Sequence, residues 1–380
     1  LVVDKGYWRA TNTSKEILAC HNGDACLGGQ TGSPDYCKEE YEGPYCSVCQ
    51  DGYAAGLGFT CDSCSGSRRL LVMGLAIAMI AVGTVCVAYI VTYLVSINGG
   101  GSQSEWLHQR LLRNLPLSSV KILIVVWQIL TQYAAIANVT YPKSYEAFLK
   151  LVDVVNLDFG WMVSAACFWS RIDFHDRLLL STLGPLGGLA GLAVTYTIAQ
   201  RRISAISSLD DGERARDCRV RHISALLLLT FLVYSSVSSI VFRTFSCENL
   251  DDGYEYLRDD YRIICTEDRH SMFKVYAGIM IVVYPVGIPL LYAKLLMRRG
   301  CVTIDSVSND SRGALVDDLQ EPYRPERFYY EVIESARRVS ITGVSVFIFP
   351  GDAAQIALTL VITFAFFVVS EVLRPYKRSF

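Results

Sequence analysis

Charged residues are scarce in this chain. They make up 19% of its 380 residues, whereas soluble globular domains usually carry about 25%. Hydrophobic residues make up 52%, and the formal net charge at pH 7 is only −2. No basic run is long enough to indicate nucleic-acid binding. The composition therefore argues against a soluble domain and against a nucleic-acid partner, and it predicts a protein that lies in a lipid bilayer.

Motifs of common enzyme sites are missing as well. The chain has no glycine-rich phosphate loop of the Walker type and no GxSxG nucleophile elbow. Its five histidines show neither HExxH nor HxH spacing: His21, His108, His175, His222 and His270. We therefore expect no enzymatic activity, no cofactor and no metal site.

What the chain does contain is a cysteine-rich segment that runs directly into an apolar stretch. Seven of the 13 cysteines precede Arg69: Cys20, Cys26, Cys37, Cys46, Cys49, Cys61 and Cys64. The stretch Leu70–Ile97 carries no charged residue, and a membrane-spanning helix needs about 20 apolar residues. Because disulfides persist on the oxidising side of a membrane, residues 1–69 are predicted to be extracellular. The chain starts at Leu1 without an initiator methionine or a signal-peptide pattern, so we expect it to be part of a longer or processed protein.

The cysteine spacing alone allows two chemistries. Two CxxC pairs, at residues 46–49 and 61–64, could hold zinc or form disulfides. The adjoining span and the N-glycosylation sequon at Asn12 favour a secreted segment, and hence disulfides. A second sequon, at Asn138, falls on the predicted outer side. Asn12 and Asn138 are therefore the predicted glycosylation sites.

Apolar stretches further along the chain predict an all-α bundle of about seven membrane spans over residues 70–376. The expected spans are Leu70–Ile97, Ser118–Asn138, Arg177–Ala199, His222–Phe245, Met272–Met297, Phe328–Phe349 and Ala353–Leu373. Lys and Arg accumulate in loops that stay in the cytoplasm, and they are frequent in segments 200–221 and 298–327 and after Leu373. These parts and segment 98–117 are predicted to be cytoplasmic. The N-terminus is then outside and the C-terminus inside.

One apolar stretch leaves the number of spans open. Leu151–Trp169 is interrupted by Asp153 and Asp158, and counting it as a crossing would place the arginine-rich segment 200–221 outside. We therefore interpret it as part of a half-inserted outer segment near 145–176, whereas an eight-span arrangement would reverse the last four spans. Asp153 and Asp158 are the best candidates for an outer cation contact, although helix capping or contact with water explains them too.

Two further signals favour the seven-span topology. Cys247 and Cys265 bracket an acidic loop, residues 247–270, that this topology places outside, where the two cysteines can form a disulfide. A third sequon, at Asn309, falls on the cytoplasmic side, so no glycan is expected there.

Ionisable residues near the membrane are concentrated at the start of the sixth expected span. Glu331, Glu334, Arg337 and Arg338 lie there. Glu334 and Arg338 are four residues apart in the favourable acid-first order, and Glu331 shares their helical face. Two interpretations fit: an ion-pair cluster at the cytoplasmic edge of the membrane, or a gating latch that contacts a neighbouring helix.

Prolines interrupt two of the expected spans. Pro285 and Pro289 remove two backbone donors from the fifth span, which must kink or break there. The segment 184–188, with a proline among three glycines, is expected to do the same in the third span. Such helices fit a bundle that bends or lines a path, and static bundles contain them too.

The cysteine-rich segment resembles laminin-type EGF and ephrin-receptor-like modules. Their Tyr-x-Gly-Pro-x-Cys-x-x-Cys-x-x-Gly-Tyr signature reads here from Tyr41 to Tyr53. The resemblance implies that Cys37 pairs with Cys46 and that Cys49 pairs with Cys61. An odd number of cysteines remains, so one would pair with an upstream cysteine or stay free. The resemblance fits a rigid stalk, or a ligand-binding module.

The membrane part resembles the transient-receptor-potential-like proteins of protists and algae, which are loosely similar to polycystin-type channels and fungal flavin carriers. The matching motifs are Lys121-Ile122-Leu123 with Trp127-Gln128-Ile129, Asn156-Leu157-Asp158-Phe159, Tyr284-Pro285-Val286-Gly287-Ile288-Pro289, Tyr323-Arg324-Pro325 with Tyr330-Glu331, and Pro350-Gly351-Asp352 through Gln355. The resemblance implies a cation channel or a channel-like protein. Channels of that class have a filter loop between their last two spans. Here only residues 350–352 join those spans, so the pore lies elsewhere or the domain does not conduct.

The functional expectation is a channel-like protein of the plasma or ciliary membrane that responds to force or to a ligand on its extracellular part. Its expected partners are the lipid bilayer and other membrane or extracellular chains, in a homo- or hetero-oligomer. A structural anchor for an extracellular filament or matrix is a second hypothesis. A seven-span receptor is a third, although the DRY-like and NPxxY-like signatures of that class do not occur at the expected span ends.

Overall fold

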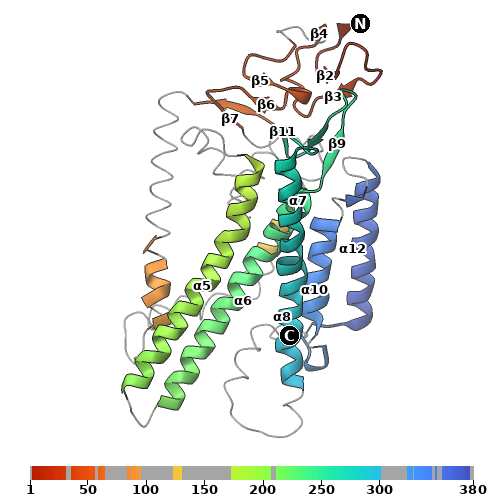
Figure 1. The fold of residues 1–380 in the computed structure, drawn as a ribbon. Coiled ribbons are helices and arrows are strands. Elements are labelled where there is room, and N and C mark those ends of the chain that lie inside the picture. The colour runs from red at the N-terminus through yellow and green to blue at the C-terminus, as the bar shows by residue number, and fades with distance from the viewer. Residues whose placement is uncertain are drawn as a thin grey trace.

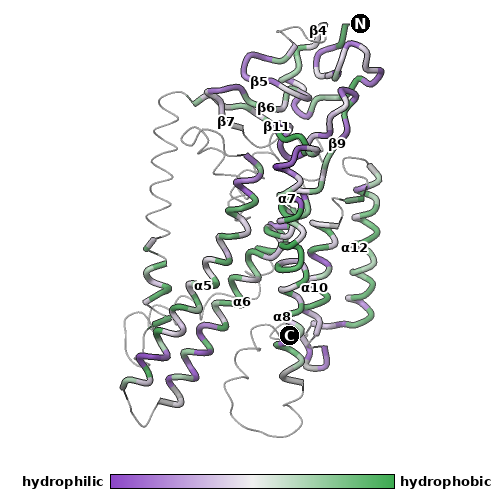
Figure 2. Tube along the Cα trace, viewed as in Figure 1, coloured by the Kyte–Doolittle hydropathy of each residue, from purple (hydrophilic) through white to green (hydrophobic). Residues whose placement is uncertain are grey.

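The computed structural model describes residues 2–30, 36–55, 59–64, 84–85, 87–92, 94–95, 123–130, 173–206, 211–300, 323–327, 329–344, 347–348 and 353–376. A small disulfide-rich head, residues 2–64, lies at one end of a set of long helices (Figure 1). Figure 2 shows that apolar residues follow the middle of these helices, whereas hydrophilic residues gather in the head and at the opposite ends of α5 and α6.

Short antiparallel strand pairs form the head. They are β1 (Val2–Val3) with β4 (Gly29–Gln30), β2 (Tyr7–Trp8) with β3 (Leu18–Ala19), β5 (Tyr41–Glu42) with β6 (Val48–Cys49), and β7 (Tyr53–Ala55) with β8 (Cys61–Ser63). A 3₁₀ helix, Pro44–Cys46, lies between β5 and β6. Disulfides join Cys20 to Cys26, Cys37 to Cys46, and Cys49 to Cys61. Covalent links of this kind compensate for a core too small to hold such a segment alone.

The region predicted as an acidic loop is a three-stranded antiparallel sheet, so the expected all-α class is incomplete. The sheet consists of β9 (Cys247–Asn249), β10 (Glu255–Leu257) and β11 (Asp260–Ile264), in the order β11-β10-β9. Gly253 has a φ of 85° in the turn between β9 and β10, a conformation that other residues rarely adopt. The Cys247–Cys265 disulfide closes the sheet at its base. Its acidic composition concealed these short strands.

Below the sheet, the described chain is helical. The elements are α5 (Phe174–Ile206), α6 (Asp211–Arg243), α7 (Asp268–Ile281), the π-helix η4 (Val282–Val286), α8 (Gly287–Gly300), the 3₁₀ helix η5 (Pro325–Arg327), α10 (Tyr330–Val339), the π-helix η6 (Ser340–Val344) and α12 (Ala353–Leu373). Among the described residues, four helices are long and apolar enough to cross a membrane: Phe174–Ala205, Arg214–Arg243, Asp268–Met297 and Ala354–Leu373. The chain therefore has the character of a multi-pass membrane protein.

Four candidate spans are fewer than the seven expected. Most of the first two expected spans lies outside the described residues. In the sixth, α10 is short and carries buried charges before it passes into η6. The last span matches its expected bounds, Ala353–Leu373, whereas α5 and α6 extend beyond theirs. Hydropathy locates the apolar part of a helix, and the helix continues past it into its charged ends.

Helix α6 lies at the centre of the described bundle. In its apolar window 67% of the residues are buried, against 33% or less in the other three candidate spans. Four serines on α6 are buried: Ser235, Ser236, Ser238 and Ser239. Small residues of this kind let helices approach closely in a membrane. Gly343 of η6 lies so near the Phe242 ring that a β-carbon would collide with it, so the contact between η6 and α6 requires glycine.

The two proline-containing spans behave differently. In the fifth, the helix changes to a π-helix at Pro285 and resumes as α8 at Gly287. Pro289 has no N–H to give to the Pro285 carbonyl four residues back, and the Tyr234 hydroxyl of α6 donates to that carbonyl at 3.4 Å. The predicted interruption is present there. In the third, where a kink or a break was expected at 184–188, α5 runs from Phe174 to Ile206 through Pro185 without a break.

Candidate functional site

The head rests on the outer sheet through one carboxylate. The Tyr45 hydroxyl of the head donates a hydrogen bond to Glu248 Oε1, and the Tyr261 hydroxyl of β11 donates to Glu248 Oε2, both at 2.9 Å. Both tyrosines are buried. The head and the sheet therefore share a carboxylate whose two oxygens each accept a proton from one buried phenol.

Aromatic rings surround this carboxylate. The Tyr45 and Tyr261 ring centroids are 5.3 Å apart, and the His21 ring lies 4.6 Å from Tyr45 and 4.7 Å from Phe59. His21 Nε2 also lies 2.9 Å from the Tyr261 hydroxyl. Trp8 packs on the other side of Tyr45, at 5.1 Å. Buried aromatic contacts of this size dominate the energetics of interfaces, so the head is docked and not loosely tethered.

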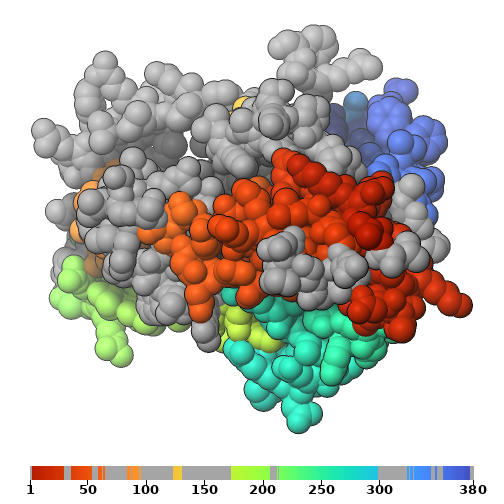
Figure 3. All heavy atoms as spheres, turned by 90° about the horizontal axis from the view of Figure 1, so that it is seen from above, coloured from red at the N-terminus to blue at the C-terminus, as the bar shows by residue number. Residues whose placement is uncertain are grey.

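A second polar contact lies further along the same interface. Ser14 Oγ donates to the Asp251 carboxylate at 2.6 Å. Ser14 is the hydroxyl residue of the first predicted sequon, and Asn12 is exposed. Seen from the head end, the head covers part of the sheet and leaves another part of it exposed (Figure 3).

The environment of the two phenols favours their neutral form. Burial first, and then the negative charge of Glu248, raise the pKa of Tyr45 and of Tyr261 well above the ordinary value. An ionised phenol would be buried beside a carboxylate, without a proton to share with it. The interface therefore requires protonated tyrosines.

Alkaline pH should weaken the head–sheet interface. The neutral phenols contribute their full stabilisation below the ordinary tyrosine pKa of about 10, and this is lost as the pH rises through their higher pKa values in the folded state. We expect the melting temperature of the wild type to fall more steeply above about pH 10 than that of Tyr45→Phe/Tyr261→Phe. Parallel curves for the two proteins would show that other groups titrate.

The sheet is joined firmly to the helices below it. The Asp260 carboxylate of β11 accepts a hydrogen bond from the Phe174 N–H at the start of α5, at 3.2 Å. Negative charge at a helix N-terminus is stabilising. Arg262 binds Asp260 at 2.8 Å. The strands β9 and β11 continue through short connections into α6 and α7. The sheet is therefore connected to the start of α5, the end of α6 and the start of α7.

A buried histidine pair lies at this junction. His175 Nε2 of α5 is 3.0 Å from His270 Nδ1 of α7. Asp173 lies 3.8 Å from His175 Nδ1 and 2.9 Å from the Arg269 guanidinium. Burial opposes the ionisation of Asp173, but the nearby His175 ring, the hydrogen bond from the Asp176 N–H and the charge of Arg269 hold its pKa well below the usual value. The pair links the outer ends of α5 and α7 through polar contacts.

His270 also lies within 4.8 Å of the sulfurs of Cys247 and Cys265. Such a group could hold a metal ion only if the sulfurs were thiolates. Here the two sulfurs are bonded to each other. The arrangement therefore fits a structural disulfide and not a metal centre.

The second polar centre is the predicted ion-pair cluster on α10, which lies beside α6 at the level of Phe231 and Tyr234. Arg338 lies 3.7 Å from both Glu331 and Glu334, and Arg337 donates to Glu334 at 2.9 Å. The Tyr323 hydroxyl donates to Glu331 at 2.9 Å. Burial and the charge of Glu331 raise the pKa of Tyr323.

This cluster contacts neighbouring helices. The Arg338 guanidinium lies 4.5 Å from the centre of the Phe231 ring on α6, a cation–π distance. The Tyr234 hydroxyl of α6 donates to the Ser335 carbonyl of α10 at 3.2 Å. Tyr323 forms a β-bridge with Tyr376 after α12. The cluster therefore connects α6, α10 and the segment that follows α12.

Some of the other site residues predicted from the sequence lie within the described part of the chain, and some do not. Pro285 lies in η4 and Pro289 in α8. Asn138, Asp153 and Asp158 lie outside the described residues. Cys20 pairs with Cys26, a bond left open by the sequence, and Cys64 is disulfide-bonded too.

Sequence reasoning missed both outer contact sites. Glu248 was seen only as one of many acidic residues in a loop, and His175 and His270 lie too far apart in the chain to suggest a pair. The available signal was the Tyr-x-Gly-Pro-Tyr turn, which holds Tyr45 at a φ of 56° and buries its ring.

Comparisons with protein-family models, with curated proteins and with solved structures found no match for this chain.

Proposed function

We propose that this chain is a channel-like subunit of the cell-surface membrane, of the transient-receptor-potential-like kind, in which the head transmits force or ligand binding to the membrane helices. The observation that carries the proposal is the docking of the head on the sheet through Glu248, because that sheet is continuous with α6 and α7. A displacement of the head is thereby passed to two candidate spans.

The elements below the sheet suit such a transmission. Helix α7 leads to the π-helix at Pro285, whose carbonyl is bound by Tyr234 of α6, and the same hydroxyl reaches Ser335 of α10. A π-helix inside an α-helix often marks a functional site. Arg338, three residues further along α10, belongs to the charge cluster. A continuous set of contacts therefore leads from the head to the charge cluster on α10.

We further propose seven spans with the N-terminus outside and the C-terminus inside. Cys64 belongs to the head, and Asp173 lies beside the sheet on which the head rests. The chain between them begins and ends on one side, which requires an even number of crossings. The first two expected spans meet that requirement when residues 151–169 stay on the outer side. The β-bridge between Tyr323 and Tyr376 joins the segment before the sixth expected span to the segment after the seventh. This supports a sixth and a seventh span that start and end on the same side.

A conducting assembly would form its pore between subunits. Only residues 350–352 join the last two expected spans, which is too short for a filter loop. In the apolar window of α12 just 6% of residues are buried, so this helix offers a broad face to lipid or to a second copy.

The test is cation flux into liposomes that contain the purified protein, recorded with and without membrane tension. We expect tension to raise the flux through the wild type, and we expect Glu248→Gln, which removes the charge that binds the head, to reduce this response. Glu255→Gln changes an acidic residue of the same sheet and serves as the control. Absence of cation flux in the wild type under every tension would overturn the channel proposal.

The docked head also favours a second candidate, a structural anchor for an extracellular assembly. Disulfides and buried aromatic contacts carry load from the head to the spans without any need for a pore. An anchor would show no flux, and extracellular chains would co-purify with the wild type but not with a protein that lacks the head.

A further inference from the structure

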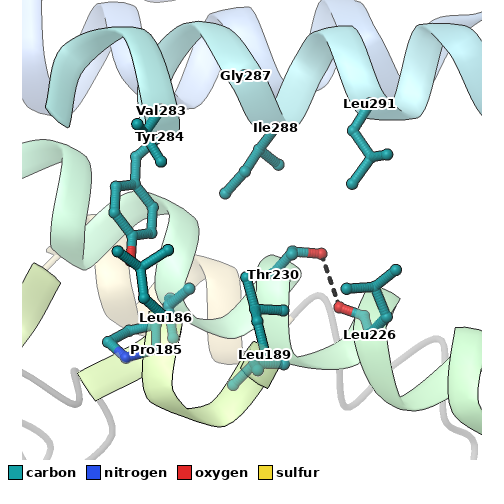
Figure 4. Close-up of a pocket in the computed structure, with 12 residues that line it drawn as sticks. Pro185, Leu186, Leu189, Leu226, Thr230, Val283, Tyr284, Gly287, Ile288 and Leu291 are labelled. Atoms are coloured by element: carbon teal, nitrogen blue, oxygen red, sulfur yellow. Dashed lines mark hydrogen bonds between the residues drawn. The ribbon is translucent and has the colours of Figure 1, made fainter. Parts of the chain in front are cut away.

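An apolar cavity lies halfway along three of the candidate spans. Its volume is about 190 Å³. The lining residues come from the middle of α5, α6 and the η4–α8 segment, within residues 185–189, 226–233 and 283–291. Figure 4 shows Ile288 and Leu291 pointing from α8 toward Leu189 and Leu226. At this position along the spans, the cavity lies at the depth of the hydrocarbon core of a bilayer.

The shape of the cavity follows from how the helices meet. Helices α5 and α8 are both packed beside α6, and the cavity is the cleft between them. Toward the head, the Tyr284 hydroxyl donates to the Thr182 carbonyl of α5 at 2.6 Å and closes the cleft. Toward the other end, Thr230 of α6 and Tyr292 of α8 are joined at 2.9 Å. Val283, at the margin, is 39% exposed, so the cleft is open to the side.

The few polar atoms in this cleft already have partners within the protein. The Thr230 hydroxyl bonds the Leu226 carbonyl (Figure 4) and the Tyr292 hydroxyl. The Tyr284 hydroxyl bonds Thr182. A buried water needs two to four polar partners, and an ion needs more. The cleft therefore offers a site to hydrocarbon and not to water or a cation.

We propose that this cleft binds the acyl chain of a membrane phospholipid. An apolar cavity of about 150 Å³ stays dry and accepts a benzene-sized ligand, so about 190 Å³ accommodates part of an acyl chain. The occupant enters from the side, at the depth where acyl chains lie. Because it separates α5 from α8 beside the π-helix, its presence sets the angle between these helices. This inference goes beyond the proposed function and does not depend on conduction.

Photo-crosslinking tests the proposal. Vesicles containing the full chain and a phosphatidylcholine with a diazirine in one acyl chain are dissolved in lipid-free detergent, and the purified protein is irradiated. We expect cross-links on peptides that contain residues 185–189, 226–233 or 283–291. Leu360 and Phe364 of α12, which are 68% and 64% exposed, report lipid held only at the surface. They should be labelled severalfold less, because detergent displaces surface lipid.

Two filling variants from different helices make the result specific. Leu189→Trp and Leu226→Phe should each lower the cleft labelling severalfold. Leu290→Trp adds the same bulk on the outward face of α8, where the side chain is 62% exposed, and should leave the labelling unchanged. Equal labelling of the cleft and α12, labelling that survives both filling variants, or no cleft labelling in the wild type would each overturn the proposal. The last result would show that another part of this chain fills the cleft.

Discussion

Arg338→Met should lower the free energy of unfolding by about 3–5 kcal/mol, the usual cost of removing one partner from a buried ion pair. Of the two arginines in the cluster, Arg338 forms ion pairs with both Glu331 and Glu334. Its side chain is 6% exposed. Without it, the two buried carboxylates Glu331 and Glu334 have too few positive charges beside them. The measurement is reversible unfolding in mixed micelles of mild and denaturing detergent, followed by fluorescence.

Arg337→Met is the matched control. It removes the same functional group from the preceding residue, whose side chain is 28% exposed and donates to Glu334. The loss should be less than half of that for Arg338→Met. A triple variant, Glu331→Gln/Glu334→Gln/Arg338→Met, should recover most of the stability, because neutral amides no longer need a cation. Equal losses for the two single variants would contradict a special role for Arg338.

The cluster also shows what a sequence alone can supply. The spacing of Glu331, Glu334 and Arg338 predicts one helical face, and the structure brings the three side chains together on it. Periodicity concerns a single helix, so it could not identify Phe231 or Tyr323 as partners. These contacts depend on how separate parts of the chain pack.

The helices show the same difference between what a local sequence specifies and what packing specifies. Helix α12 was predicted to the residue, because its apolar run is bounded by proline and aspartate on one side and by Arg374 on the other. The π-helix that contains Pro285 was predictable as an irregularity, because two prolines four residues apart remove two backbone donors from the helix. The continuity of α5 through Pro185 was not, since a single proline is tolerated in a membrane helix when its surroundings satisfy the freed carbonyl.

The outer sheet was hidden for another reason. Its strands are short and acidic, and β-propensity depends on the surface against which a strand packs. Leu257 and Tyr261 are buried only because α6, α7 and the head surround them. No local pattern in residues 247–270 records that surface, so the disulfide was predictable and the sheet was not.

Glu248→Ala should release the head from the sheet at a cost of about 2–4 kcal/mol, because it leaves the buried Tyr45 hydroxyl unpaired and removes one partner of Tyr261. We expect faster amide hydrogen exchange in β5 and β6, which flank Tyr45, with little change in α12. Glu255→Ala, on the neighbouring strand, is the control and should leave head exchange as in the wild type.

The size of the change in hydrogen exchange tells whether Glu248 holds the head on the sheet or only lies near it. Glu248→Gln keeps a carbonyl oxygen that accepts from one phenol, but it presents an NH₂ group to the other. Amide hydrogen exchange in β5 and β6 of this variant should therefore lie between that of the wild type and that of Glu248→Ala. If the aromatic cluster of His21, Phe59 and Trp8 held the head by itself, all three proteins would exchange alike. Since a carboxylate can accept both phenol protons and alanine neither, a graded series would locate the link between head and membrane helices at Glu248.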